Sequence, residues 1–137
     1  MDCIFCRIVA GEIPSHKVYE DDMTLAFLDI HPAARGHTLV IPKQHVADLL
    51  SADPLDLEAT VRGSQVVARI LHKHLQADGI NVVQNNGTAA GQDVFHYHVH
   101  LIPRWTGDQA IRSWRPGETD HAALGSLAAE LRAAEGT

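Results

Sequence analysis

The chain has 137 residues and a formal charge of −6 with its histidines neutral, which fits one domain with a continuous core. An acidic chain without a cluster of Lys and Arg is a poor binder of nucleic-acid polymers, because such binding depends on neutralising phosphates, and its charge also disfavours anionic membranes. No apolar run reaches the roughly 18 residues of a membrane span, and no signal segment is recognisable. We therefore expect a cytoplasmic protein with reduced cysteines.

The N-terminal segment holds both cysteines of the chain, Cys3 and Cys6, at C-x₂-C spacing. This spacing is typical of structural zinc sites, but it supplies only half of a tetrahedral shell. His45 and one histidine from 96–100 are candidates for the missing ligands, since thiolate and imidazole together suit zinc. A redox pair is disfavoured because Cys3 lies too near the start to follow the strand of a βαβ unit. A pair of simple buried thiols stays open.

Three strands are expected in the first third of the chain, near Val18, over 24–29 and over 38–42. Asp29 is an acid within the second apolar run, which Pro32 stops. An acid in that place is either a strand-end residue hydrogen-bonded to backbone or a carboxylate that accepts hydrogen bonds from paired hydroxyls, as on a ribose. Both readings stay open at this point.

A long helix is expected from Pro54 to Ala77, with Asp53 as its cap and Gly79 as its stop. Its large apolar residues form a broad stripe suited to a sheet or to a twin helix. They are Leu57, Val61, Val67, Ile70, Leu71 and Leu75. A last helix is expected over 122–134.

Three histidines occupy alternate positions near the end of the domain, at His96, His98 and His100. In a strand over 96–102 their rings would share one face, and burial would cost roughly 1–3 kcal/mol for each ring nitrogen left unpaired. They can act as nucleophile, proton carrier or metal ligand, because the unperturbed pKa of histidine lies near neutrality. One ion held by all three is disfavoured, since the ends of the run are about 13 Å apart in a strand.

A strand over 80–85 and a glycine-bearing loop over 87–93 precede the histidines, which indicates a hairpin. Backbone N–H groups from Gly91 to Val94 would then lie beside the histidines and could cradle an anion. Together these elements predict the α+β class, with an antiparallel sheet of about five strands, a long helix and a C-terminal helix.

Five sequence blocks together resemble the histidine triad (HIT) family of nucleotide hydrolases and transferases, in its bacterial, zinc-containing Hint-like branch. The blocks occur in the family's order at 3–8, 11–14, 26–30, 36–43 and 91–100. The resemblance implies a HIT-like fold and a single domain over 1–137, in which 1–104 matches the family core and 105–137 is a variable C-terminal segment. It also implies a homodimer.

By this resemblance, His98 attacks the α-phosphorus of a purine nucleotide adduct, such as a nucleoside phosphoramidate, and forms a nucleotidyl-histidine that water hydrolyses. His100 would stabilise the phosphate oxygens, and His37 would brace the pocket. The residues implied in nucleotide binding are Phe5, Ile8, Ile13, Phe27, Asp29, Ile30, Asn85, Gly91, Gln92 and Val94. A structural zinc ion would be held in a closed shell by Cys3, Cys6, His45 and His96.

The sequence departs from the family pattern at Asp93, where many relatives have a serine that binds phosphate. A carboxylate repels a phosphate unless its side chain turns away, so Asp93 is left out of the expected phosphate contacts, and the family's leaving-group preference is not carried over. Two other functions stay open. One is a catalytic metal on the three histidines, and the other is a binding module that responds to nucleotide or zinc without turnover.

Overall fold

The computed structural model describes residues 2–134 and has one five-stranded sheet in the order β1-β2-β3-β5-β4. Its strands are β1 (Lys17–Glu20), β2 (Thr24–Leu28), β3 (Thr38–Pro42), β4 (Gly79–Gln84) and β5 (Val99–Arg104). All neighbouring strands are antiparallel. The predicted α+β class with an antiparallel sheet is therefore confirmed.

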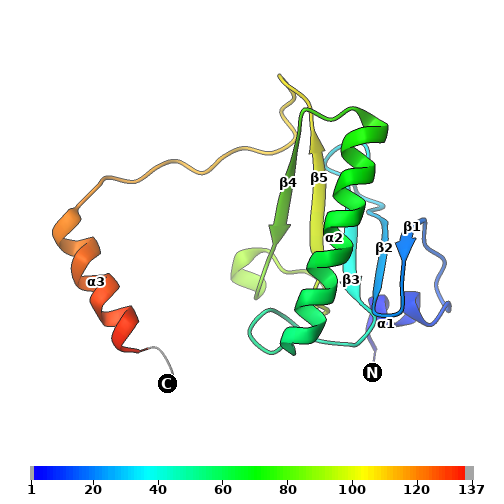
Figure 1. The fold of residues 1–137 in the computed structure, drawn as a ribbon, viewed down its shortest axis with the longest axis horizontal. Helices are drawn as coiled ribbons and strands as arrows, with labels where there is room; N and C mark the ends of the chain where they lie inside the picture. The colour runs from blue at the N-terminus through cyan, green and yellow to red at the C-terminus, as the bar shows by residue number, and fades with distance from the viewer. Residues whose placement is uncertain (1, 135–137) are drawn as a thin grey trace.

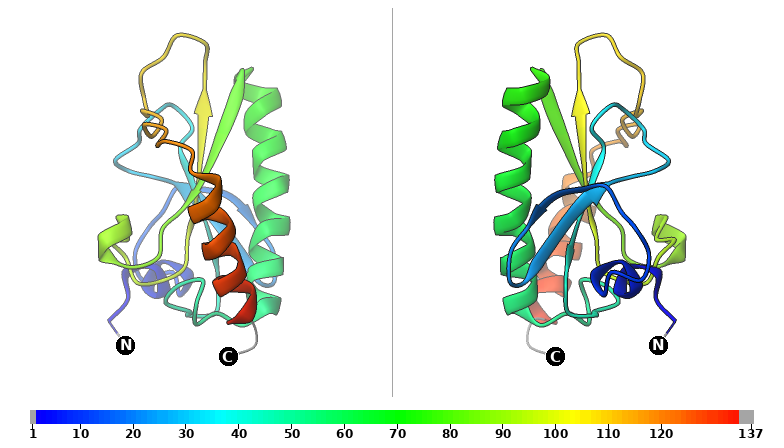
Figure 2. Two further views of the ribbon diagram at one scale, coloured as in Figure 1. Left: turned by 90° about the vertical axis from the view of Figure 1, so that its left-hand side faces the viewer. Right: turned by 90° about the vertical axis from the view of Figure 1, so that its right-hand side faces the viewer.

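Helices cover both faces of this sheet (Figure 1 and Figure 2). The short helix α1 (Ile4–Val9) packs on one face, and the long helix α2 (Pro54–Leu75) packs on the other. Because side chains alternate along a strand, Leu25 and Phe27 belong to the apolar cluster of α1, whereas Ala26 between them belongs to the cluster of α2. The inner strands β2 and β3 are thus buried on both faces, whereas the edge strand β4 is not.

The sequence patterns do not predict helix α1, which has only six residues and is too short to show a helical period. Cys3 caps it, since its Sγ accepts a hydrogen bond from the Cys6 N–H at 3.4 Å. Phe5 and Ile8 are the buried residues of the helix. One short helix therefore carries the two cysteines on the same turns as two large residues of the core.

Helix α2 begins where predicted, because the Asp53 carboxylate accepts a hydrogen bond from a first-turn N–H at 2.8 Å. It ends at Leu75 rather than at Ala77. Gln76 takes the left-handed conformation that ends the helix, with φ 52°. The prediction that Gly79 stops the helix is therefore wrong: this glycine is the first residue of β4.

The buried face of α2 differs from the predicted stripe of large apolar residues. Val67 is fully buried, but Val61 and Ile70 are 61% and 44% exposed. The helix lies close to the sheet at Gly63, where an added Cβ would be 2.7 Å from Thr24 Cγ2. Because only a small residue allows this approach, close packing decides the buried face and leaves part of the predicted stripe at the surface.

Strand β5 starts at Val99, later than the predicted position 96. Pairing with β3 and β4 stops there, because the Tyr97 N–H donates instead to the carbonyl of Val46 in a loop, at 2.7 Å. The alternation of faces nevertheless continues upstream of the strand. Tyr97 is buried on the α2 side, and the ring of His98 lies 5.2 Å from that of Phe5 in α1.

After β5 the chain runs through an extended segment to helix α3 (His121–Ala133), which lies apart from the sheet (Figure 1). This agrees with the predicted helix over 122–134. None of the residues of α3 is buried, and Leu124, Leu127 and Leu131 are 55%, 51% and 64% exposed. Over residues 2–134, no helix combines the length and the hydropathy that a membrane span requires.

Candidate functional site

A cavity of about 340 Å³ lies where α1, β2 and the segment before β5 meet. His98 and His100 line it. So do seven of the ten residues predicted to bind nucleotide, namely Phe5, Ile8, Ile13, Phe27, Asp29, Ile30 and Val94. Two further histidines, His16 and His31, and the carboxylate of Asp93 also line it, so the cavity joins an apolar wall to four imidazoles and two carboxylates. None of its lining residues is Lys or Arg.

The ring of His98 is buried and held in one tautomer. Its Nδ1–H donates to the carbonyl of His96 at 2.7 Å, because a carbonyl oxygen can only accept. In the neutral ring, Nε2 therefore carries a lone pair and no proton. Since the ring is 4% exposed and lines the cavity, this arrangement presents one nucleophilic nitrogen to a ligand.

His37 and His100 form a hydrogen-bonded pair beside His98. The Ala33 N–H donates to His37 Nδ1 at 3.0 Å, so a neutral His37 carries its proton on Nε2. That atom lies 2.9 Å from His100 Nδ1 and 3.5 Å from Asp29 Oδ2. Donation from His37 to His100 leaves the proton of His100 on Nε2, where it is free to be donated to a ligand.

Both rings of this pair are neutral near pH 7. Burial lowers the pKa of His37. Burial, together with the neighbouring His98 and His37, lowers the pKa of His100 to about 4. The pair can therefore keep the tautomers described above over the whole neutral range of pH.

We expect the free energy of unfolding to fall as the pH falls from about 6.5 to 5, in part through His100. Its pKa is about 4 in the folded chain and about 6.5 when unfolded. The unfolded chain thus binds more protons in this window, so stability rises with pH. Denaturant titrations at both ends of the window give the change in the free energy of unfolding between the two pH values. This change should be smaller by about 1–2 kcal/mol in His100→Asn than in wild type. The exposed His72, changed to Asn, is the control, and an equal pH effect in wild type and His100→Asn would contradict a neutral His100.

The loop over 87–93 is held together by Gln92. Its Oε1 accepts a backbone N–H at 2.7 Å, and its Nε2 donates to two backbone carbonyls at 2.7 and 3.1 Å. Gly91, at φ 95°, takes a conformation that favours glycine and lies against Asn85. Gln92, Gly91 and Asn85 do not line the cavity, and their contact with a nucleotide stays a prediction.

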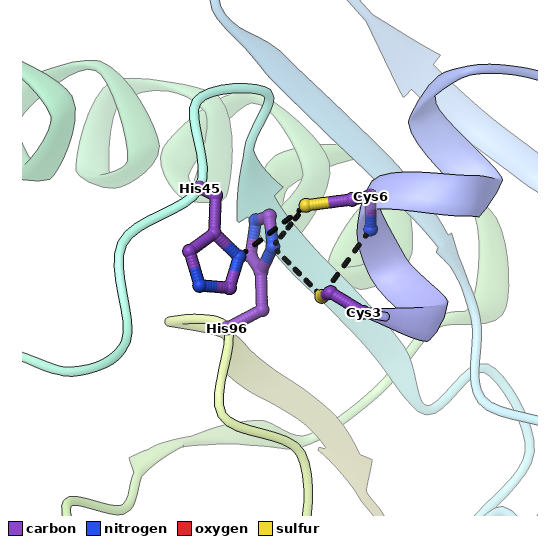
Figure 3. A group of neighbouring side chains, drawn as sticks. All are labelled: Cys3, Cys6, His45 and His96. Carbon is purple, nitrogen blue, oxygen red and sulfur yellow. Dashed lines mark hydrogen bonds between the residues drawn. The ribbon is translucent and has the colours of Figure 1, made fainter. Parts of the chain in front are cut away.

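Cys3, Cys6, His45 and His96 come together in a second cluster, with their ligand atoms all within 4.8 Å of one another (Figure 3). Cys3 Sγ lies 3.5 Å from His96 Nδ1, and Cys6 Sγ lies 3.3 Å from His45 Nδ1 and 3.6 Å from His96 Nδ1. A tetrahedral zinc ion with ordinary bond lengths separates sulfur and nitrogen ligands by roughly 3.5 Å. The four predicted metal ligands are therefore arranged as a zinc site requires.

The surroundings of the cluster also suit a metal. The Nε2–H of His96 donates to the carbonyl of Pro42 at 2.8 Å, so the Nδ1 lone pair faces the sulfur atoms. Both cysteines are free thiols. Burial and the neighbouring Cys3 raise the pKa of the Cys6 thiol, so two thiolates in this place need a cation beside them.

The three histidines of the alternating run do not share one metal site. Among residues 2–134, two groups of side chains could hold an ion: the cluster of Figure 3, which includes His96, and the group Asp29, His37 and His100. His98 belongs to neither. A single catalytic ion on His96, His98 and His100 is therefore disfavoured by the geometry.

Sequence reasoning missed some cavity residues, among them Leu39. Leu39 pairs with Phe27 across β2 and β3, so strand alternation could have placed it on the same face. Sequence reasoning also left open which way the Asp93 side chain points. In the structure its Oδ1 lies 3.7 Å from His98 Nε2. The sequence carries no signal for the side-chain rotamer of an exposed residue.

The HIT domain family model matches residues 10–107 of this chain. This chain is similar in structure to a HIT-family protein from Bacillus subtilis, whose crystal structure matches it with a TM-score of 0.93 and 36% identity. The match covers 100% of this chain and 99% of that protein's chain. The structure of a zinc-bound histidine triad family protein from Mycobacterium smegmatis covers 98% of this chain and 99% of its own, with a TM-score of 0.77 and 42% identity.

Adenylylsulfatase HINT3 from Arabidopsis thaliana is 44% identical to this chain over 103 residues, which are 75% of this chain and 52% of that relative. The range matched by the family model contains His98, His100 and their partner His37. It starts after Cys3 and Cys6, so the metal cluster is supported by its own geometry rather than by the family match.

Proposed function

This chain belongs to the HIT-domain family, and from that premise we propose that it is a nucleotide hydrolase or nucleotidyl transferase. Its substrates are purine nucleoside phosphoramidates or related nucleotide adducts, cleaved at the α-phosphate through a nucleotidyl-His98. A relative named as an adenylylsulfatase supports hydrolysis of a nucleotide adduct. The observation that carries the proposal is the single tautomer of the buried His98, whose Nδ1–H is held at 2.7 Å by a backbone carbonyl.

In the first step, His98 Nε2 gives its electron pair to phosphorus. The P–N bond breaks, its electron pair goes to the amine nitrogen, and the amine takes a proton from solvent as it leaves. Imidazole suits this step because an uncharged nucleophile meets less repulsion from a phosphate than a carboxylate does. The ring becomes cationic, and the hydrogen bond from Nδ1–H to the His96 carbonyl stabilises that charge.

In the second step, water adds to phosphorus and the N–P bond breaks, so that the electron pair returns to His98 Nε2. One proton goes back to solvent, and the products over the two steps are the amine and the nucleoside monophosphate. A neutral His100 donates from Nε2 to a phosphoryl oxygen in both steps. His37 is a positioning residue, because its hydrogen bond at 2.9 Å sets the tautomer of His100.

The purine base is proposed to lie against the apolar wall of the cavity. Asp29 then accepts hydrogen bonds from the ribose hydroxyls. Its Oδ1 already accepts the His31 N–H at 2.8 Å, which fixes the carboxylate in place. Asn85, Gly91 and Val94 remain as predicted phosphate contacts, and Gln92 remains a predicted nucleotide-binding residue.

A structural zinc ion is proposed for the cluster of Cys3, Cys6, His45 and His96. Four protein ligands fill a tetrahedral shell, so such an ion has no open position for substrate. When bound, it would cross-link the N-terminus to the segment that carries His98. The role of the ion is therefore to stabilise the fold, and it takes no part in the reaction.

We also propose a homodimer. β4 is an edge strand of the sheet, and an unpaired edge can accept a strand from another chain. Val82 on β4 and Val61 and Ile70 on α2 are exposed apolar residues, which a second copy would cover. The cytoplasmic location stays a prediction from the sequence.

Two alternatives lead to different experimental outcomes. A catalytic metal would need the reacting groups around one ion, and His98 lies outside both possible metal groups of residues 2–134. A binding module without turnover has no need of a nucleophile, whereas His98 and His100 both line the cavity. The hydrolase is therefore favoured over both.

Release of AMP from adenosine 5′-phosphoramidate by the purified, zinc-loaded protein tests the proposal. We expect turnover, and we expect a brief pulse of chelator to leave the initial rate unchanged, because the nucleophile is a side chain. Prompt loss of activity on chelation would indicate a catalytic metal instead. AMP binding without any release from the phosphoramidate would favour the binding module.

A further inference from the structure

We propose that Asp93 makes this site select nucleotide adducts whose leaving group is a cationic amine, such as a diamine or the side chain of a basic residue. The inference rests on the proposed function and deepens it, because it names the charge of the group that leaves. Adducts with anionic leaving groups, such as sulfate or a polyphosphate, would be cleaved less well.

The first observation is the position of the carboxylate. Asp93 Oδ1 lies 3.7 Å from His98 Nε2, so the side chain turns toward the reacting nitrogen and not away from it. The side chain is 83% exposed, and it is therefore free to meet a group that projects out of the cavity. As His98 Nε2 attacks, the leaving group would lie on the side of phosphorus away from that nitrogen, toward the opening of the cavity, where the exposed Asp93 carboxylate can extend to meet it.

The second observation is the path that a leaving group can take. A second hollow lies beside the nucleotide cavity, and Ile4, Ile13, Asp93 and Val94 line both. Cys3 and His45 of the metal cluster also line this second hollow. A nucleotide that fills the first cavity with its phosphate at His98 would therefore have Asp93 close to that phosphate and at the border of the second hollow. The only Lys or Arg that lines this hollow is Arg7, and its guanidinium already pairs with Glu12 at 3.3 Å.

The third observation is the charge of the nucleotide cavity itself. Its lining includes two carboxylates, those of Asp29 and Asp93, and no Lys or Arg. Each added negative charge on a leaving group would be repelled by Asp93, and the guanidinium of Arg7 in the second hollow is already paired with Glu12. An ammonium group on the leaving amine would instead be attracted to Asp93 and would reduce its repulsion of the α-phosphate.

The bonds that form and break are those of the first step of the proposed reaction. His98 Nε2 bonds to phosphorus, the P–N bond breaks toward the amine nitrogen, and that nitrogen takes one proton from solvent. Asp93 exchanges no proton and forms no bond in this step. It acts through its charge on a distant ammonium of the same leaving group.

Three AMP monoamides that share the P–N bond and differ at the far end of the amine test the proposal. Their amines are 1,3-diaminopropane, butylamine and 4-aminobutyrate, which end in a cation, a methyl group and a carboxylate. The quantity to measure is kcat/KM for each amide with wild type, Asp93→Asn, Asp93→Ser and the exposed control Asp22→Asn. Comparing variants cancels the intrinsic reactivity of the three amides.

We expect the ratio of kcat/KM for the cationic amide to that for the anionic amide to fall about tenfold in Asp93→Asn and in Asp93→Ser, and to stay unchanged in Asp22→Asn. In wild type the ratio should also shrink as salt is added, because ions screen an exposed charge. A ratio that is the same in wild type and both Asp93 variants would overturn the inference. So would loss of all turnover in both variants, because Asp93 would then serve every substrate alike. If wild type cleaves none of the amides, including the neutral one, the proposed function itself fails.

Discussion

Replacing His98 with alanine should lower kcat/KM for adenosine 5′-phosphoramidate by at least about a thousandfold. The variant keeps the apolar wall and the Asp29 carboxylate, so it should still bind AMP. It loses the ring nitrogen that attacks phosphorus, and water would have to attack directly. A neutral His100 with its proton on Nε2 cannot replace it without losing the hydrogen bond that it gives to the phosphate.

His72→Ala is the matched control for this experiment, because it removes an exposed imidazole from α2, outside the cavity lining. It should keep the wild-type rate. Since His98 is buried, the alanine variant should be checked by circular dichroism, thermal unfolding and AMP affinity. A folded His98→Ala that binds AMP and retains more than about a tenth of the activity would rule out His98 as the nucleophile.

Replacing Cys6 with serine should remove the bound zinc and lower the free energy of unfolding by about 3–5 kcal/mol, a fall in Tm on the order of 10 °C. Serine keeps the size of the side chain but is a poor ligand for zinc, and three ligands do not close the shell. Because Cys3 and Cys6 lie on the same turns as Phe5 and Ile8, a loosened α1 should also raise KM for the nucleotide.

Metal content and thermal unfolding together check this prediction. His74→Ala is the control, since it removes an exposed histidine from the far end of α2 and should leave both unchanged. Wild type that has been treated with chelator for long enough to lose zinc should unfold at the temperature of Cys6→Ser. Full zinc occupancy in Cys6→Ser, or an unchanged Tm after zinc loss, would contradict a structural metal at this cluster.

Much of the fold follows from local sequence patterns. The strand alternation that separates Leu25 and Phe27 from Ala26 is visible in the sequence, and so is the cap of α2 at Asp53. What the patterns do not contain is the packing that overrides them. The absence of a side chain at Gly63 lets α2 pack closely against Thr24. With α2 in this position, two large apolar residues of the predicted stripe lie at the surface.

The candidate site, like the fold, is only partly predictable from the sequence. The spacing of the cysteines and histidines indicates a metal site but leaves open which histidine of 96–100 joins it, and the resemblance to the HIT family assigns His96 to the metal and His98 to catalysis. Neither predicts that both residues lie before β5 rather than within it. The strand pairing stops short of them because the backbone N–H of Tyr97 donates to the loop carbonyl of Val46 instead. The rotamer of Asp93 likewise depends on space in the folded chain, so only the structure shows it beside His98.

The central claim is that His98 becomes covalently bonded to the nucleotide during turnover. Wild-type protein mixed with adenosine 5′-phosphoramidate should be quenched within the first turnover under conditions that preserve a phosphorus–nitrogen bond, and its peptides should then be weighed. We predict an adenylyl adduct on the peptide that contains His98, localised to that residue by fragmentation, which disappears on longer incubation and is absent in His98→Ala. Turnover at the wild-type rate without any adduct at early times would show that water attacks phosphorus directly and would contradict the account.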